Sequence, residues 1–205
     1  PAEAPAGLRL LDGEAPAATV RMAVHVEVER LRGEGIEPTL ALVAVGEDPA
    51  SQIYLKRKRA ACAEAGIRVT DALLPAGTGT ADVVARVREL GADPGVHGLL
   101  VQLPMMSPAD PHAVLEAVPP GKDVDGFHPV NVGRLVAGHP APRPCTPAGV
   151  VALLDRYAIG IEGKEAVVVG RSNIVGKPLA LMLLARHATV TLCHTRTRDL
   201  AAVTR

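Results

Sequence analysis

The chain has 205 residues, of which 48% are hydrophobic and 21% charged, a composition typical of one or two globular domains. The high apolar fraction and the zero net charge exclude disorder for most of the chain. Basic and acidic residues both number 22, so no basic excess is present to bind nucleic acid through its phosphates. No apolar run is long enough for a membrane-spanning helix. We therefore expect neither nucleic acid nor a membrane as a partner.

The three cysteines, Cys62, Cys145 and Cys193, are widely spaced and odd in number. This pattern argues against a disulfide framework and favours a reducing compartment such as the cytoplasm. The histidines and cysteines have no zinc-type spacing, so we predict no metal site. The first residues contain no basic segment followed by an apolar stretch, and no signal peptide is recognisable there.

The first half of the chain alternates between helical and strand patterns. Apolar residues at helical spacing predict a helix that Gly33 ends, and the apolar run 40–45 predicts a strand buried on both faces of a parallel sheet. The next elements expected are a helix from the capping residue Ser51 to about Ala65, a strand over about 67–74, a helix from Thr80 to Gly91, an apolar strand at 97–104 that contains Gln102, and a short helix capped by Asp110.

A segment rich in proline and glycine, 119–146, separates this block from a second one and is expected to line a cleft. The second block predicts a helix opened by Thr146, a strand at 165–170, a helix over about 176–186 and a strand at 188–193. The alternation predicts a two-domain α/β fold with parallel sheets, divided into 1–145 and 146–205. The second domain has two strands where a nucleotide-binding half has about three, so we expect a truncated Rossmann-type domain.

The segment VVVGRSNIVGKPLA (167–180) predicts a strand, a turn and a helix. Gly170 opens the turn and Gly176 begins the helix, whose N-terminus would offer free amides to a pyrophosphate. The spacing departs from GxGxxG because Ser172 occupies the place of the second glycine. The alternative interpretation is an ordinary strand–turn–helix.

No acidic residue that could bind a ribose diol occurs between Gly176 and Thr197. Thr195 and Arg196 are available there instead, together with Arg171 in the loop before Gly176, which favours NADP over NAD. The alternative is a solvated loop with incidental arginines.

Tyr54 and Lys58 lie four residues apart in PASQIYLKRKRAACAEAGI (49–67), so they share one face of the predicted helix. A lysine beside a phenol in a cleft can transfer protons. The alternative is a solvated basic face formed by residues 56–59.

Three further polar residues, Gln102, Asp123 and Asp125, are candidates for a functional site. Gln102 lies between Val101 and Leu103, and a buried amide there is either structural or points into a site. Asp123 and Asp125 fail the EF-hand spacing, so hydrogen bonding of a carboxylate to a polar ligand is the simpler interpretation.

Five motifs occur in a fixed order: VGEDPASQIYLKRKRAACAEAGI, GLLVQLPM, GKDVDGFHPVNVGRL, PCTPAGV and VVVGRSNIVGKPLA. Together they closely resemble the bifunctional methylenetetrahydrofolate dehydrogenase/methenyltetrahydrofolate cyclohydrolase family, from about Leu10 to Arg205. The resemblance implies oxidation of 5,10-methylenetetrahydrofolate with NADP, hydrolysis of the methenyl product in the same cleft, a folate-binding catalytic domain at 1–145 and a homodimer.

The resemblance also implies roles for single residues. It implies that the catalytic residues are Lys58, Tyr54 and Gln102. It implies that the folate substrate is bound by Tyr54, Asp125 and Ser51. It implies that NADP is bound by Gly170, Arg171, Ser172, Gly176 and Thr195, and that no metal takes part.

One departure from the family pattern is large, because its C-terminal part, including the motif PVPGGVGPMT, is absent from this sequence. Two alternatives to the bifunctional enzyme follow. One is a catalytically impaired, folate-binding remnant. The other is an NAD-specific monofunctional dehydrogenase, against which Arg171 and Thr195 argue.

Overall fold

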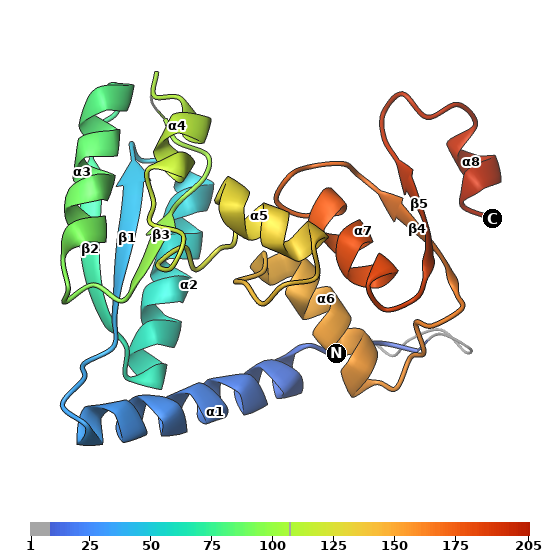
Figure 1. The fold of residues 1–205 in the computed structure, drawn as a ribbon, viewed down its shortest axis with the longest axis horizontal. Helices are drawn as coiled ribbons and strands as arrows, with labels where there is room; N and C mark the ends of the chain where they lie inside the picture. Colours follow the sequence, from blue (N-terminus) through green and yellow to red (C-terminus); the bar gives the residue numbers. More distant parts are fainter. Residues whose placement is uncertain (1–8, 107) are drawn as a thin grey trace. The chain divides into compact units, whose positions relative to one another are not determined.

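The structure is a computed structural model that describes residues 9–106 and 108–205. The chain forms two compact units, described in turn (Figure 1). The first unit comprises residues 21–144, and the second comprises residues 9–20 and 145–205. The predicted functional domains, 1–145 and 146–205, stay a prediction. The expectation that the first residues form no recognisable signal peptide concerns mainly residues 1–8, which lie outside the described residues.

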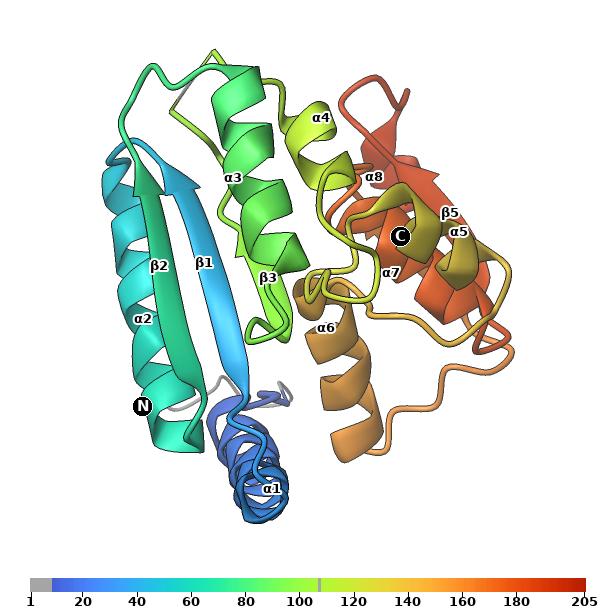
Figure 2. The same ribbon diagram turned by 60° about the vertical axis from the view of Figure 1, so that its left-hand side comes forward.

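The first unit contains a three-stranded parallel sheet in the order β2-β1-β3. Strand β1 (Thr39–Val45) lies between β2 (Arg68–Leu74) and β3 (Gly98–Val101). Helices α2 (Pro49–Ala65) and α3 (Thr80–Ala92) cover opposite faces of this sheet (Figure 2). The predicted parallel α/β arrangement is therefore confirmed for this unit.

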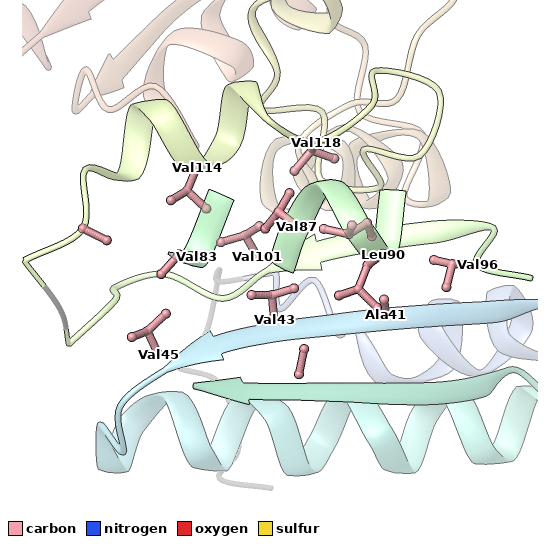
Figure 3. Close-up of a cluster of buried hydrophobic side chains, with 13 residues drawn as sticks. Ala41, Val43, Val45, Val83, Val87, Leu90, Val96, Val101, Val114 and Val118 are labelled. Carbon is pink, nitrogen blue, oxygen red and sulfur yellow. The ribbon is translucent and has the colours of Figure 1, made fainter. Parts of the chain in front are cut away.

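The sheet is buried on both faces, as the apolar run at 40–45 predicts. Alternate residues of β1 divide between two clusters, because successive strand side chains point to opposite faces. Ala41, Val43 and Val45 pack with α3 and the short helix α4 (Pro111–Glu116) in the larger cluster (Figure 3). Leu42 and Ala44 pack on the other face against Leu55 of α2.

Helix α2 begins differently from the prediction. Its N-cap is Asp48, whose carboxylate accepts a hydrogen bond of 2.7 Å from the backbone N–H of Ser51, and Pro49 is the first helical residue. The prediction that Ser51 caps the helix is wrong. A carboxylate satisfies the free amide as well as a hydroxyl does, and proline with its fixed φ is favoured at the first position.

Two further boundaries and one additional helix differ from the predictions. Gln102 lies immediately after β3, which ends at Val101. Helix α3 continues to Ala92, one residue beyond Gly91. The segment 119–146 contains an unpredicted helix, α5 (Pro129–Val136), which His128 caps by accepting the N–H of Val130 at 3.1 Å.

The second unit contains a parallel pair, β4 (Glu165–Val169) and β5 (Thr189–Cys193), connected by α7 (Gly176–Leu184). Helix α6 (Cys145–Arg156) precedes the sheet and α8 (Leu200–Val203) follows it. The core includes Ile161, Val168, Leu183 and Ala188. The strand–helix–strand order predicted for this region is confirmed, with α7 ending two residues before Arg186.

Tyr157 connects the two sequence segments of the second unit. Its hydroxyl accepts the N–H of Asp12 at 2.9 Å and donates to the carbonyl of Asp12 at 3.0 Å. The guanidinium of Arg9 lies 5.4 Å from the centre of the tyrosine ring. Helix α1 (Glu14–Gly33) begins at this anchored segment and continues into the first unit.

Among the residues described, no helix combines the length and apolar character needed to cross a bilayer.

Candidate active site

The topology of the first unit defines where a site can form. The chain leaves β1 for β2 on one side and later adds β3 on the other side, so the strand order reverses at β1. In open parallel sheets, ligands bind beyond the carboxyl ends of the strands at such a reversal. The start of α2 and the residue Gln102 both follow the carboxyl ends of these strands. Gly46, with φ of 76°, makes the turn out of β1.

Lys58 and Gln102 meet at this edge of the sheet. The Lys58 Nζ donates a hydrogen bond of 3.1 Å to the Gln102 Oε1. Gln102 is only 8% exposed, and its Nε2 donates to the carbonyl of Leu103 at 2.6 Å. Because that carbonyl can only accept, the amide nitrogen must face Leu103 and the amide oxygen must face the lysine. The structure therefore gives Gln102 a definite orientation toward Lys58.

Tyr54 lies one turn before Lys58 on α2, as the spacing predicts. Its side chain is 57% exposed, so the ring is accessible to a ligand. Cys62 lies one turn after Lys58 and is half-buried. Burial raises the pKa of the Cys62 thiol, while the nearby charge of Lys58 acts in the opposite direction. This thiol is therefore no activated nucleophile at neutral pH.

The two acids of GKDVDG have different environments. Asp123 is 5% exposed and accepts hydrogen bonds from the backbone N–H groups of Gly126 and His128, at 3.0 and 2.9 Å. Asp125 is half-buried. Asp123 forms an isolated parallel bridge with Leu99 of β3, and Val124 and Asp125 lie in the turn that follows it. The Asp123 carboxylate is thus committed to internal hydrogen bonds, and the folate contact expected of Asp125 stays a prediction.

Ser51 lies in the first turn of α2 and is buried. Its Oγ has no hydrogen-bond partner among the residues that the structure describes. A hydroxyl without a partner near the sheet edge is compatible with the predicted substrate contact, which stays a prediction. The described residues include no group of three or more histidine, cysteine, aspartate or glutamate side chains arranged to hold a metal ion.

The loop between β4 and α7 has a specific internal bonding pattern. The Oγ of Ser172 accepts the backbone N–H groups of Val175 and Gly176, at 3.1 and 3.3 Å. The N–H of Lys177 donates to the Ser172 carbonyl at 3.1 Å, and Pro178 has no N–H. The expectation that the start of this helix offers free amides to a pyrophosphate is therefore wrong. The serine that replaces the second glycine occupies those donors instead.

Gly176 has a steric reason to be glycine. A Cβ atom built at this position would lie well inside van der Waals contact of the Gly170 carbonyl and 2.9 Å from the backbone nitrogen of Arg171. Gly170 itself has φ of 135° and donates its N–H to the carbonyl of Cys193 at 2.8 Å. The two glycines therefore let the loop fold back on the first turn of α7 at the end of the sheet.

Arg171 and Thr195 each lie two residues after the end of one of the paired strands, β4 and β5. Val169 pairs with Cys193 in the parallel ladder, so both residues lie two positions beyond the last pair. Both are exposed. Thr195 lies in a turn that is closed by a hydrogen bond of 2.8 Å from the N–H of His194 to the Oγ1 of Thr197. The ladder thus brings these two predicted cofactor residues to one edge of the sheet.

Each of the two parallel α/β units has polar residues beyond the carboxyl ends of its strands, the place where the class of α/β enzymes with open parallel sheets binds its ligands. Two family profiles match the chain: "Tetrahydrofolate dehydrogenase/cyclohydrolase, catalytic domain" over residues 11–125, and its "NAD(P)-binding domain" over residues 144–205. The chain belongs to the tetrahydrofolate dehydrogenase/cyclohydrolase family.

Named relatives agree with this assignment. The bifunctional protein FolD of Moorella thermoacetica is 56% identical over 95% of this chain and 69% of its own length. The crystal structure of the bifunctional FolD enzyme of Campylobacter jejuni matches with a TM-score of 0.92 at 45% identity, covering 95% of this chain and 69% of that one. The Trypanosoma brucei enzyme, complexed with NADP cofactor and inhibitor, matches with a TM-score of 0.89 at 34% identity, covering 98% and 68%.

Proposed function

We propose that this protein oxidises 5,10-methylenetetrahydrofolate with NADP and hydrolyses the resulting 5,10-methenyl compound to 10-formyltetrahydrofolate. The observation that carries the proposal is the hydrogen bond between Lys58 and Gln102 at the carboxyl edge of the sheet, in a chain of this family. The Campylobacter jejuni relative is named as a bifunctional enzyme, and the Trypanosoma brucei relative is described with NADP.

The oxidation places modest demands on the protein. Hydride leaves the bridging methylene carbon for the nicotinamide while a neighbouring nitrogen lone pair forms the iminium bond, so no strong base is required. The protein therefore acts by positioning the two reacting carbons. In this proposal Tyr54 and Asp125 hold the pterin, with Ser51 as a further contact. NADP supplies the hydride acceptor.

The hydrolysis needs proton transfer. Water must be deprotonated as it attacks the methenyl carbon, and a proton must reach the ring nitrogen as the ring opens. Lys58 is the catalytic residue proposed for both transfers. Gln102 is a positioning residue, because its oxygen is held toward Lys58 by the bond that its amide nitrogen makes to Leu103.

The cofactor residues proposed are Gly170, Arg171, Ser172, Gly176 and Thr195. The exposed guanidinium of Arg171 and hydroxyl of Thr195, together at one sheet edge, fit the 2′-phosphate of NADP. Gly170, Ser172 and Gly176 shape the loop between β4 and α7 rather than all contacting the cofactor directly. A homodimer is part of the proposal through the family resemblance, and light scattering on the purified protein tests it.

The test compares Lys58→Met with Lys56→Met. Lys56 is an exposed lysine two residues earlier on the same helix, so it is a matched control for the loss of one positive charge. We expect Lys58→Met to abolish hydrolysis of methenyltetrahydrofolate, followed by its absorbance, while tetrahydrofolate binding remains measurable. Lys56→Met should retain both. Wild-type hydrolysis in Lys58→Met would refute the catalytic role of this lysine.

The alternative of a folate-binding remnant predicts a different outcome. Such a protein would bind tetrahydrofolate but reduce no NADP in the presence of methylenetetrahydrofolate. An NAD-specific monofunctional dehydrogenase would reduce NAD and hydrolyse nothing. Paired assays with NADP, NAD and the methenyl compound on one preparation distinguish the three functions.

A further inference from the structure

The carboxylate of Asp123 is the centre of a buried hydrogen-bond cluster. Its Oδ1 accepts the backbone N–H of Gly126 at 3.0 Å. Its Oδ2 accepts the backbone N–H of His128 at 2.9 Å and the side-chain Nδ2 of Asn131, also at 2.9 Å. Asp123 is 5% exposed and Asn131 is 0% exposed, so solvent does not compete for these bonds. Bonds of this kind to a buried charge are strong and strongly directional.

Asn131 is placed to serve this cluster. Its Nδ2 also donates to the carbonyl of Pro120 at 2.9 Å, so both amide hydrogens are used. Its Oδ1 has no hydrogen-bond partner within residues 9–106 and 108–205. An unpaired buried amide oxygen costs stability. Stability alone therefore does not explain an asparagine at this position, whereas its two donated bonds connect both ends of the segment 120–131.

The segment around Asp125 is fixed on both sides. Before it, the N–H of Leu99 in β3 donates to the carbonyl of Lys122 at 2.7 Å. After it, Gly126 has φ of 67° and packs so closely that an added Cβ would lie 2.6 Å from the carbonyl oxygen of Pro142. Val124 and Asp125 are the two residues between the bridged Asp123 and this tightly packed glycine. The backbone position of Asp125 is therefore determined by the cluster.

We propose that Asp123 and Asn131 are positioning residues for Asp125, a role that rests on the proposed binding of the folate pterin by Asp125. The buried carboxylate accepts the backbone N–H groups of Gly126 and His128, which follow Asp125 in the chain, so the backbone at Asp125 loses little conformational freedom when the ligand binds. Preorganisation of this kind lowers the entropic cost of binding. Asp123 and Asn131 act through Asp125 and contact no ligand.

The first test is Asp123→Asn, which preserves the shape of the side chain. An asparagine at this position can accept a bond on one side only, and its amide group would oppose either the N–H of Gly126 or the donors from His128 and Asn131. We expect the dissociation constant for tetrahydrofolate, measured anaerobically by calorimetry, to rise by about tenfold, as the loss of one such bond would cause. The dissociation constant for NADP should stay unchanged.

The second test is a double-mutant cycle. If Asp123 acts through Asp125, then Asp123→Asn in an Asp125→Ala background should weaken tetrahydrofolate binding no further than Asp125→Ala alone. Asp93→Asn is the matched control, because the Asp93 carboxylate also accepts a loop amide, that of Gly95, at 2.7 Å. This control should bind like the wild type. Additive losses in the cycle, or wild-type binding by Asp123→Asn, would overturn the proposal.

The folding of each variant is checked by circular dichroism. If Asp123→Asn does not fold, Asn131→Ala takes its place in the cycle, because it removes one of the three donors to the carboxylate. The same non-additivity with Asp125→Ala is expected. If the wild type does not bind tetrahydrofolate, or if Asp125→Ala binds it as tightly as the wild type, the folate role of Asp125 is refuted and this inference with it. If Asp125→Ala weakens tetrahydrofolate binding but Asp123→Asn binds tetrahydrofolate as tightly as the wild type, only the positioning role of Asp123 is refuted.

Discussion

Lys58 on α2 and Gln102 after β3 are joined by a hydrogen bond of 3.1 Å, although 44 residues separate them in the chain. The bond exists because α2 packs on the sheet through Leu55, which is fully buried one turn before Lys58. Packing of one helix face against the sheet thereby determines where the lysine amine lies.

Gln102→Leu is expected to lower kcat for hydrolysis of the methenyl compound while the protein still folds. Leucine has a similar volume but cannot accept the bond from Lys58, so the lysine loses its orientation. A hydrogen bond to a charged group contributes about 1.5–3 kcal/mol, so kcat for hydrolysis of the methenyl compound should fall about tenfold or more. Stopped-flow absorbance measures it. An unchanged kcat with a lowered melting temperature would show that Gln102 is merely structural.

Arg171→Ala is expected to weaken NADP much more than NAD. The 2′-phosphate is present only in NADP, and a guanidinium can bind it through two hydrogen bonds. The difference between the two losses should be about 1.5–3 kcal/mol if one charge-assisted contact disappears. Dissociation constants for both cofactors, at one fixed salt concentration, provide the measurement.

Arg156→Ala is the matched control for the preceding substitution, since Arg156 is an exposed arginine of the same unit, at the end of α6. It should leave both constants unchanged. Equal weakening of NAD and NADP by Arg171→Ala would refute the assignment of cofactor specificity to this residue.

Gly176→Ala is expected to disrupt the loop between β4 and α7. The added methyl group would overlap the carbonyl of Gly170, which is backbone and cannot rotate away. Overpacking of this kind costs about 1–3 kcal/mol of stability. Denaturant unfolding measures that loss, and we expect NADP binding to weaken as well. Gly163→Ala is not a suitable control because Gly163 has φ of 69°. Gly160→Ala is suitable, because open space surrounds that position.

The ion pair between Asp155 and Arg186 predicts an acid-sensitive contribution to stability. The Asp155 carboxylate accepts bonds of 3.0 and 2.6 Å from Arg186, which hold the pKa of the carboxyl group below its usual range. The folded state therefore binds the proton less readily than the unfolded state, and the stabilisation present at neutral pH is lost as the pH falls through the lowered pKa.

Asp155→Asn should accordingly flatten the dependence of the free energy of unfolding on pH below about pH 4, where an ordinary aspartate titrates. Urea unfolding at a series of pH values measures this slope. Both groups are exposed, so the change should be small and should decrease further at high salt. A slope identical to that of the wild type would contradict the prediction.

Local patterns in the sequence were sufficient for much of the architecture. The apolar run at 40–45 is buried on both faces because a central strand of a parallel sheet is covered on both sides. Tyr54 and Lys58 share a helix face because their spacing matches the helical period. Asp110 caps α4 and Pro111 begins it, because both features depend on the first helical turn alone.

The sequence by itself determined most of the elements, with α5 as an exception, together with their order and the residue types available to the site, since these follow from short-range periodicity and chemistry. Only the tertiary structure decided which of two similar residues takes which role. Asp123 rather than Asp125 is buried in a hydrogen-bond cluster. The physical reason is that a polar group is defined by its surroundings in the folded chain. Gln102 meets Lys58, which lies 44 residues away in the sequence, and the segment that carries Asp123 is paired with Leu99 of β3.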